Sequence, residues 1–180
     1  MRWNIDQTHS TVEFGVKHLG IATVKGRFRK FDGFIEVNDA GLPVSLDVSI
    51  DAASIDTNQA DRDTHLRSPD FFDVERFPSL TFRSSSVKRL AEHEYEVAGQ
   101  LTMRGNARPV TFRAETQPVV KSPWGDHRRA GVASGKLNRK EWGLVWNQIL
   151  EAGGLAVGED VRFNLEIELI EAPAAEKVAV

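Results

Sequence analysis

The stretch TVEFGVKH, residues 11–18, decides the fold, because apolar and polar side chains alternate along it without a break. Val12, Phe14, Val16 and His18 share one side of an extended segment, and the polar residues share the other. Side chains at positions i and i+2 point to the same face of a strand, whereas a helix would spread them around its axis. The stretch therefore predicts a half-buried β-strand, with His18 at the end of its dry face.

The same period of two recurs along most of the chain. It is found in residues 44–51, 79–86, 95–103, 110–114 and 161–169. Antiparallel sheets that are wet on one side only have this signature. Between Val24 and Val37 the apolar residues change parity, which predicts a bulge or sharp bend near Arg29 and Lys30. A bent strand helps a sheet to curl.

Turn residues separate these segments, and one helical insertion interrupts them. Asn58 is suited to cap a short helix that runs to about Arg67, and Pro69 would end it, so we expect a helical insertion around residues 58–73. About eight strands with one dry face must close into a barrel or pair as a sandwich, and we favour closure, which predicts an all-β, antiparallel, eight-stranded barrel. We expect a single domain over residues 1–171, followed by a flexible tail at residues 172–180.

Composition excludes several classes of protein. The chain has 180 residues, 41% of them hydrophobic, and no cysteine, which excludes disulfide scaffolds, Cys-ligated metals and thiol chemistry. The net charge of −3 argues against a general polyanion binder. No apolar run is long enough for a membrane span, so we expect no stable membrane insertion. The N-terminus lacks a leader-like apolar segment, which predicts a cytoplasmic protein as written, or a periplasmic one if a leader was trimmed.

Two segments carry residues that could serve catalysis or nucleic-acid binding. Asp61, Asp63 and His65 lie on the expected helix, where Asp61 with His65 and Asp63 with Arg67 are spaced i, i+4. Surface ion pairs are one interpretation, a structural role in fixing the loops of a lid is another, and an enzyme acting on a lipid-like substrate is a third. Histidines elsewhere follow no ligand spacing, so we expect no metal and no catalytic group.

The basic segment at residues 25–31 interleaves aromatic and cationic side chains, which leaves a nucleic-acid contact as an alternative. Strand alternation explains the same pattern with Phe28 inward and the cations in solvent, so we expect no nucleic-acid partner. The segment GVASGK, residues 131–136, is one residue too short for a phosphate loop. Its alternating small residues indicate a strand packed against something bulky.

Several motifs together resemble the YceI-like family of polyisoprenoid-binding proteins. They are residues 3–6 with 9–10, 14 with 17–18, 26–28 with 33, 54–57, 62–68, 70–73, 77–78, 99–105, 138–139 and 142–144. The resemblance spans about residues 3–171. It implies a lipocalin-like barrel whose hollow interior binds a long apolar chain, either a polyprenyl chain with a polar head or a fatty amide. It also implies a homodimer. We expect no enzymatic activity and no cofactor.

These inferences give one prediction of function, the non-enzymatic binding, storage or transport of a long-chain amphiphile such as a polyisoprenoid. His18 is either a core histidine or a ligand contact. The predicted ligand-binding residues are Phe14, Val16, His18, Phe28, Leu46, Val48, Ile50, Phe71, Phe72, Leu80, Phe82, Leu101, Met103, Phe112, Trp142, Trp146, Phe163 and Leu165.

Overall fold

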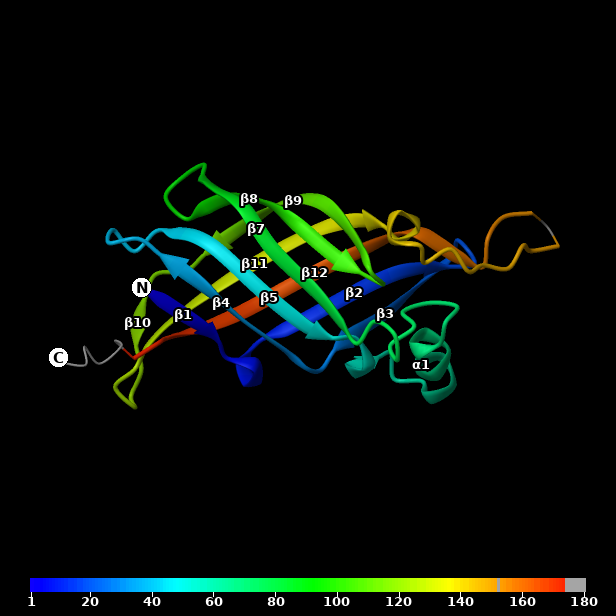
Figure 1. The fold of residues 1–180 in the computed structure, drawn as a ribbon, viewed down its shortest axis with the longest axis horizontal. Helices are drawn as coiled ribbons and strands as arrows, with labels where there is room; N and C mark the ends of the chain where they lie inside the picture. The colour runs from blue at the N-terminus through cyan, green and yellow to red at the C-terminus, as the bar shows by residue number, and fades with distance from the viewer. Residues whose placement is uncertain (152, 174–180) are drawn as a thin grey trace.

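A computed structural model describes residues 1–151 and 153–173 as one long barrel with a short helix at one end (Figure 1). The strands are β1 (Arg2–Ile5), β2 (Thr11–His18), β3 (Ala22–Phe28), β4 (Phe31–Val37), β5 (Pro43–Asp51), β6 (Ile55–Asp56), β7 (Ser79–Arg89), β8 (Glu94–Met103), β9 (Asn106–Thr116), β10 (Val120–Lys121), β11 (His127–Asn138) and β12 (Val157–Glu171). The helices are η1 (Gln7–His9), η2 (Ala52–Ser54), α1 (Ala60–Arg67) and η3 (Arg139–Trp142). The predicted tail lies outside the described residues from position 174 onward.

The barrel closes through the long antiparallel pairing of β11 with β12. β1 and β2 follow one another along the same edge of β12, so they act as one interrupted strand. β3 and β4 pair in the same way with β2 and β1. Counted so, eight strands form the ring, which confirms the predicted antiparallel eight-stranded barrel. None of the helices in the described part of the chain is long and apolar enough to cross a bilayer.

The change of parity near Arg29 and Lys30 corresponds to a sharp bend, as predicted. β3 ends at Phe28 and β4 begins at Phe31, and each then pairs with a different neighbour, β6 and β5. Both flanking phenylalanines are buried. The bend therefore turns the apolar side chains of both halves into the same interior.

The helical insertion is present, but its predicted cap is wrong. Asn58 has a φ of 60°, and its backbone N–H donates to the Asp56 carboxylate over 2.9 Å. A helix cap needs an extended backbone, so the left-handed conformation excludes this residue. Gln59 caps α1 instead, and its side-chain oxygen accepts from the Arg62 backbone N–H.

Two buried clusters occupy opposite ends of the barrel. The larger one joins the barrel wall to the segments around α1 and η3, and includes Ile55, Phe71 and Trp142. The smaller one consists of Trp3, Val37 and Leu169, near the N-terminus. In Figure 1 α1 lies at the right of the molecule and the N-terminus at the left. Any ligand site inside the barrel must lie between or beside these clusters.

Candidate functional site

The candidate site is the inner face of the barrel, which the strand register defines. Residues paired across neighbouring strands point to the same face of a sheet. Phe163 pairs with both Phe14 and Gly135, and Phe82 pairs with both Val48 and Leu101. Following these ladders around the ring places every predicted strand residue of the ligand set, from β2 to β12, on one inner face.

The predicted ligand-binding residues differ in how much surface they keep on that face. The larger cluster buries five of them: Phe28, Phe71, Leu80, Met103 and Trp142. Partly buried and packed against this cluster are Phe14, Ile50, Phe72, Leu101, Trp146 and Leu165. Partly buried and outside both clusters are Val16, Leu46, Val48, Phe82, Phe112 and Phe163.

His18 is exposed at the end of β2, so its interpretation as a core histidine is wrong. Its pairing partners are Ala22 and Val157, which lie in the last rungs of the ladder. The alternation of apolar residues continues to the end of β2, but the last residues of this strand lie beyond the packed interior of the barrel. A dry face inferred from periodicity therefore overstates burial at the end of this strand.

Glycines beneath phenylalanine rings shape the middle of the inner face. A Cβ atom added at Gly135 would lie 2.5 Å from the Phe163 ring, and one at Gly99 would lie 2.6 Å from the Phe82 ring. The two rings therefore lie against the barrel wall, in space that side chains would otherwise fill. Phe112 links them, with ring centroids 5.5 Å from Phe82 and 5.9 Å from Phe163. Sequence reasoning identified these phenylalanines, and its prediction that the small residues at 131–136 pack against something bulky is confirmed at Gly135, but it missed the role of Gly99.

At the α1 end, aromatic side chains and one histidine pack edge to face. Trp146 lies 4.7 Å from the His65 ring and 5.4 Å from the Phe71 ring. His65 Nε2 lies 2.8 Å from the Asp70 carboxylate. Trp142 is only 1% exposed, and its indole N–H donates to the Leu101 carbonyl over 2.9 Å. Trp142 is therefore part of the packed core, and Trp146 lies at its edge.

Asp63, the buried acidic residue of α1, holds the loop that precedes the helix. Asp63 is 7% exposed and accepts from the Thr57 backbone N–H over 2.9 Å and from the Thr57 hydroxyl. Arg67 donates to the carbonyls of Ala53 and Ile55. Neither expected i, i+4 ion pair forms within the described residues, because Asp63, His65 and Arg67 each bind outside the helix. The geometry matches the structural interpretation of this segment.

Buried Arg139 fixes the long connection between η3 and β12. It is 6% exposed, and its guanidinium donates to the carbonyls of Leu144, Trp146, Val157 and Gly158. Burial lowers the pKa of this guanidinium from its ordinary value. Four carbonyl acceptors compensate for the cost of taking the cation out of water. Sequence reasoning did not identify this anchor.

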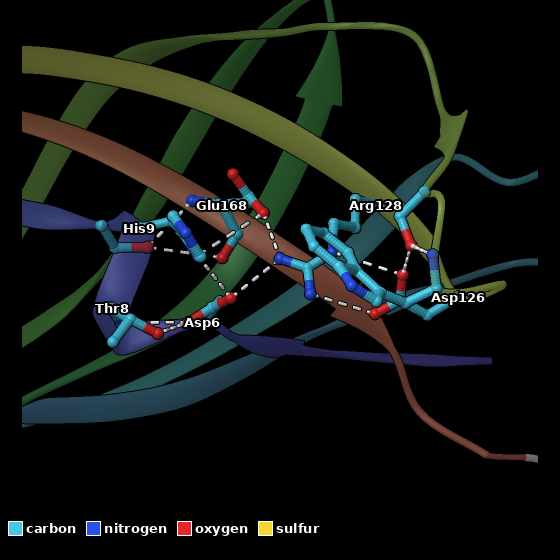
Figure 2. A network of polar contacts seen from close by, with 9 residues as sticks. Asp6, Thr8, His9, Asp126, Arg128 and Glu168 are labelled. Atoms are coloured by element: carbon cyan, nitrogen blue, oxygen red, sulfur yellow. Dashed lines mark hydrogen bonds and ion pairs between the residues drawn. The ribbon is translucent and has the colours of Figure 1, made fainter.

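A polar network on the outer surface joins η1 to β11 and β12 (Figure 2). Arg128 Nη1 lies 3.0 Å from the Asp6 carboxylate and 2.6 Å from the Glu168 carboxylate, and His9 Nδ1 lies 2.9 Å from Asp6. Hydrogen bonds from the Thr8 hydroxyl and from His9 hold the pKa of Asp6 well below its usual range, with a smaller contribution from Arg128.

Three members of this network could in principle hold a metal ion. Asp6, His9 and Glu168 place ligand atoms within 4.8 Å of one another. The Arg128 guanidinium already lies among them and supplies the positive charge that a cation would bring. The arrangement therefore stabilises the connection between β1 and β2 and does not define a metal centre.

Two of the four cationic side chains in the basic segment at residues 25–31 pair with Asp56. Arg27 and Arg29 lie 3.5 Å and 2.5 Å from this carboxylate. The backbone N–H of Asn58 and these arginines hold the pKa of Asp56 below its ordinary value. Paired cations offer less charge to a phosphate backbone, so the geometry gives the nucleic-acid alternative no support.

Two recesses lie on the outer surface. One, of about 360 Å³, is lined by Asn4, Asp32, Asp47 and Ser49 among others. The second, of about 370 Å³, lies between the bend near Lys30 and the α1 segment. Neither is lined by any predicted ligand-binding residue.

Known proteins resemble this chain over nearly its whole length. A UPF0312 protein of Staphylococcus epidermidis is 37% identical over 170 residues, which cover 93% of this chain and 96% of that protein. The YCEI protein of Campylobacter jejuni is 27% identical, with a TM-score of 0.74 over 87% of this chain and 90% of that one. A polyisoprenoid binding domain from Saccharophagus degradans has a TM-score of 0.73 at 17% identity, over 95% and 98% of the two chains, which shows a shared fold.

The fold and the inner face define a class, the small closed antiparallel barrels with an apolar interior. The sequence profile of the YceI-like domain matches residues 3–169. The chain therefore belongs to the YceI-like family, which confirms the resemblance inferred from its motifs.

Proposed function

We propose that this protein is a non-enzymatic carrier that binds a long-chain amphiphile, such as a polyisoprenoid, inside its barrel for storage or transport. The observation that carries the proposal is the group of six apolar side chains that face inward, lie outside both buried clusters and keep accessible surface. Apolar surface left accessible inside a barrel favours an apolar ligand. Membership of the YceI-like family and the fold shared with a polyisoprenoid binding domain support the same function.

The physics of such a carrier limits what can set its selectivity. At roughly 0.8 kcal/mol for each buried CH₂ group, a forty-carbon chain would gain about 30 kcal/mol, above the ceiling of about 18–21 kcal/mol for noncovalent binding. Ordering a flexible chain offsets much of that gain. Discrimination should therefore come from the length and width of the interior and from polar groups along it.

The first test is native mass spectrometry of the purified protein before and after extraction with organic solvent. We expect one or a few added masses that disappear on extraction and are recovered as lipid in the organic phase. Protein that carries no extractable lipid, and that takes up no long-chain lipid when it is offered, would contradict the proposal.

A matched pair of variants tests the location of the ligand. Phe112 faces inward on β9, whereas its neighbour Thr111 faces out and is exposed. Phe112→Asp would set an unpaired carboxylate against hydrocarbon, so we expect lipid retention to fall at least about tenfold. Thr111→Asp should retain lipid like the wild type. Because a buried carboxylate also destabilises the barrel, Phe112→Ala is the second variant, which should fold and shift the preferred chain length upward. Equal retention and equal chain-length preference in all three variants would place the ligand elsewhere.

We also propose a homodimer, in which the exposed apolar end of the barrel is the interface. Ile21 is 83% exposed in the turn between β2 and β3, and Ile149 is 85% exposed in the connection before β12. The two segments are adjacent, since the Leu19 backbone N–H donates to the Ala156 carbonyl over 2.9 Å. Highly exposed isoleucines on neighbouring segments favour contact with another protein surface.

A further inference from the structure

Four buried polar side-chain atoms lack a hydrogen-bond partner within the part of the chain that the structure describes. They are Trp3 Nε1, His93 Nδ1, Tyr95 OH and Thr116 Oγ1. An unpaired buried polar group destabilises the folded state, and native proteins keep few of them. Their positions therefore bear on what the barrel binds.

Three of these residues are neighbours at the strand ends away from α1. Tyr95 on β8 pairs with Ala114 on β9, and Thr116 lies two residues further along the same face. The Thr116 backbone N–H donates to the His93 carbonyl over 2.9 Å, which brings His93 beside Thr116. In Figure 1 this region lies at the left, with the hairpin between β7 and β8 and the N-terminus.

The fourth residue, Trp3, borders the same region from β1. Trp3 belongs to the small cluster against which Ile167 packs. Ile167 pairs with Gly131, and Gly131 pairs with Thr116. A continuous path along the inner face thus connects the Trp3 cluster to the hydroxyl of Thr116.

Small residues lie beside the two residues that carry these hydroxyl groups. Ala114, Gly131 and Ala133 lie on the inner face next to Tyr95 and Thr116. A Cβ atom added at Gly131 would meet only the Glu115 carbonyl at 3.2 Å and the Thr116 methyl at 3.9 Å. No aromatic ring fills this position, in contrast to Gly135, which lies under Phe163.

We propose that this end of the inner face is the subsite for the polar head of the ligand, where an oxygen of the head, as hydroxyl or carbonyl, binds Tyr95 OH and Thr116 Oγ1. Tyr95 is 2% exposed, so its hydroxyl gains no partner from bulk solvent. The apolar chain of the ligand would then run from Ala114 past Phe112, the next inward residue on β9. The inference rests on the proposed function, because it assigns a direction to a bound amphiphile.

The charges around the subsite favour an uncharged head. A buried anion would need a cation beside it. Arg89, which pairs with Tyr95, donates to the carbonyls of Ala91 and Glu92 in its own hairpin. Arg129 donates to the carbonyls of Gly41 and Gln117 at the barrel rim. Both guanidinium groups are thus directed to backbone carbonyls, and the unpaired atoms are two hydroxyls, the indole nitrogen of Trp3 and one imidazole nitrogen of His93.

The test compares probes that share one chain length and differ only in the head. Hexadecane, 1-hexadecanol and hexadecanoate are measured by displacement of a fluorescent apolar probe from wild-type protein, Tyr95→Phe and Thr116→Val. We expect the wild type to bind hexadecanol about tenfold more tightly than hexadecane, and each variant to lose most of that ratio. Hexadecane affinity should stay the same in all three proteins. Thr111→Val, on the outer face of β9, is the control and should keep the full ratio.

The unfolding midpoint of the Tyr95→Phe variant gives a second readout. If the Tyr95 hydroxyl served only the fold, its removal would lower this midpoint. Removing an unpaired buried hydroxyl should leave the unfolding midpoint of delipidated Tyr95→Phe equal to or above that of the wild type. A lowered midpoint together with an unchanged ratio would overturn the subsite, because the hydroxyl would then serve the fold. A ratio that favours hexadecanoate in the wild type and falls in Tyr95→Phe would overturn the assignment of an uncharged head.

The test separates this inference from the proposed function. If none of the probes displaces the fluorescent probe from the wild type, the carrier proposal itself fails. If all three probes bind wild type and variants with the same affinities, the barrel binds apolar chains and only the head subsite is wrong.

Discussion

At the scale of single residues, Asp6 joins the break between two strands to the barrel wall. Its carboxylate accepts from Thr8, His9 and Arg128 at the break between β1 and β2. These contacts lower the pKa of Asp6 in the folded state. A carboxyl group with a lowered folded pKa stabilises the protein above its unfolded pKa of about 4, and that stabilisation is lost as the pH falls below this value.

Asp6→Asn is therefore expected to lower the free energy of unfolding by about 1–2 kcal/mol at pH 7 and by less at pH 3. Denaturant unfolding from pH 7 to pH 2.5 measures both the wild type and the variant. Asp32→Asn serves as the control, since Asp32 is exposed and no ion pair joins it within the described residues. Parallel pH curves for wild type and Asp6→Asn would show that Asp6 does not supply the acid sensitivity.

At the scale of elements, α1 depends on contacts that leave the helix. The Asp63 carboxylate holds Thr57, whose hydroxyl and carbonyl also accept from Arg62. Isolated helices as short as α1 are unstable in water, and α1 has little apolar surface of its own to bury. The position of α1 over the barrel end therefore rests on these hydrogen bonds and on the neighbouring aromatic residues.

Asp63→Ala is expected to destabilise the protein by about 2–3 kcal/mol, because it leaves buried donors without an acceptor. The control is Asp61→Ala. Asp61 lies two residues before Asp63 on the same helix and is exposed, so this change should alter stability by less than about 0.5 kcal/mol. Hydrogen exchange should show faster exchange over residues 57–77 in Asp63→Ala and no change in the β7 to β9 ladder. Equal exchange in both variants would contradict the anchoring role of Asp63.

The alternation of apolar residues predicted the strands, the inner face and the bend, because strand periodicity depends only on local side-chain direction. The cap of α1 could not be predicted, since the conformation of Asn58 depends on its bond to Asp56. The same limit applies to the glycines under Phe82 and Phe163, which match the rings only after the strands have paired. Exposure of His18 likewise follows from how far β2 extends beyond its packed neighbours.

At the scale of the whole molecule, the sequence predicted the lining of the interior but not its uneven packing. Which residues face inward follows from the alternation along each strand. How deeply each one is buried depends on its position along the barrel axis. Phe71 and Trp142 close the α1 end, while Phe112 and Phe163 line the middle. The unpaired hydroxyls of Tyr95 and Thr116 had no signal in the sequence, because satisfaction of a hydrogen bond is a property of the assembled barrel.

The proposed dimer can be tested by changing two residues, Ile21 and Ile149. Ile21 and Ile149 protrude from adjacent segments, and a symmetric dimer would bury four such side chains at roughly 1.5–3 kcal/mol each. Ile21→Ser combined with Ile149→Ser is thus expected to weaken self-association more than about 100-fold, with the fold and lipid retention unchanged. Sedimentation equilibrium across micromolar concentrations should give a dimer for the wild type and a monomer for the double variant. Val120→Ser, an exposed change at the other end of the barrel, should remain dimeric. A wild type that stays monomeric would exclude the homodimer, and a dimeric double variant would assign its interface to another face.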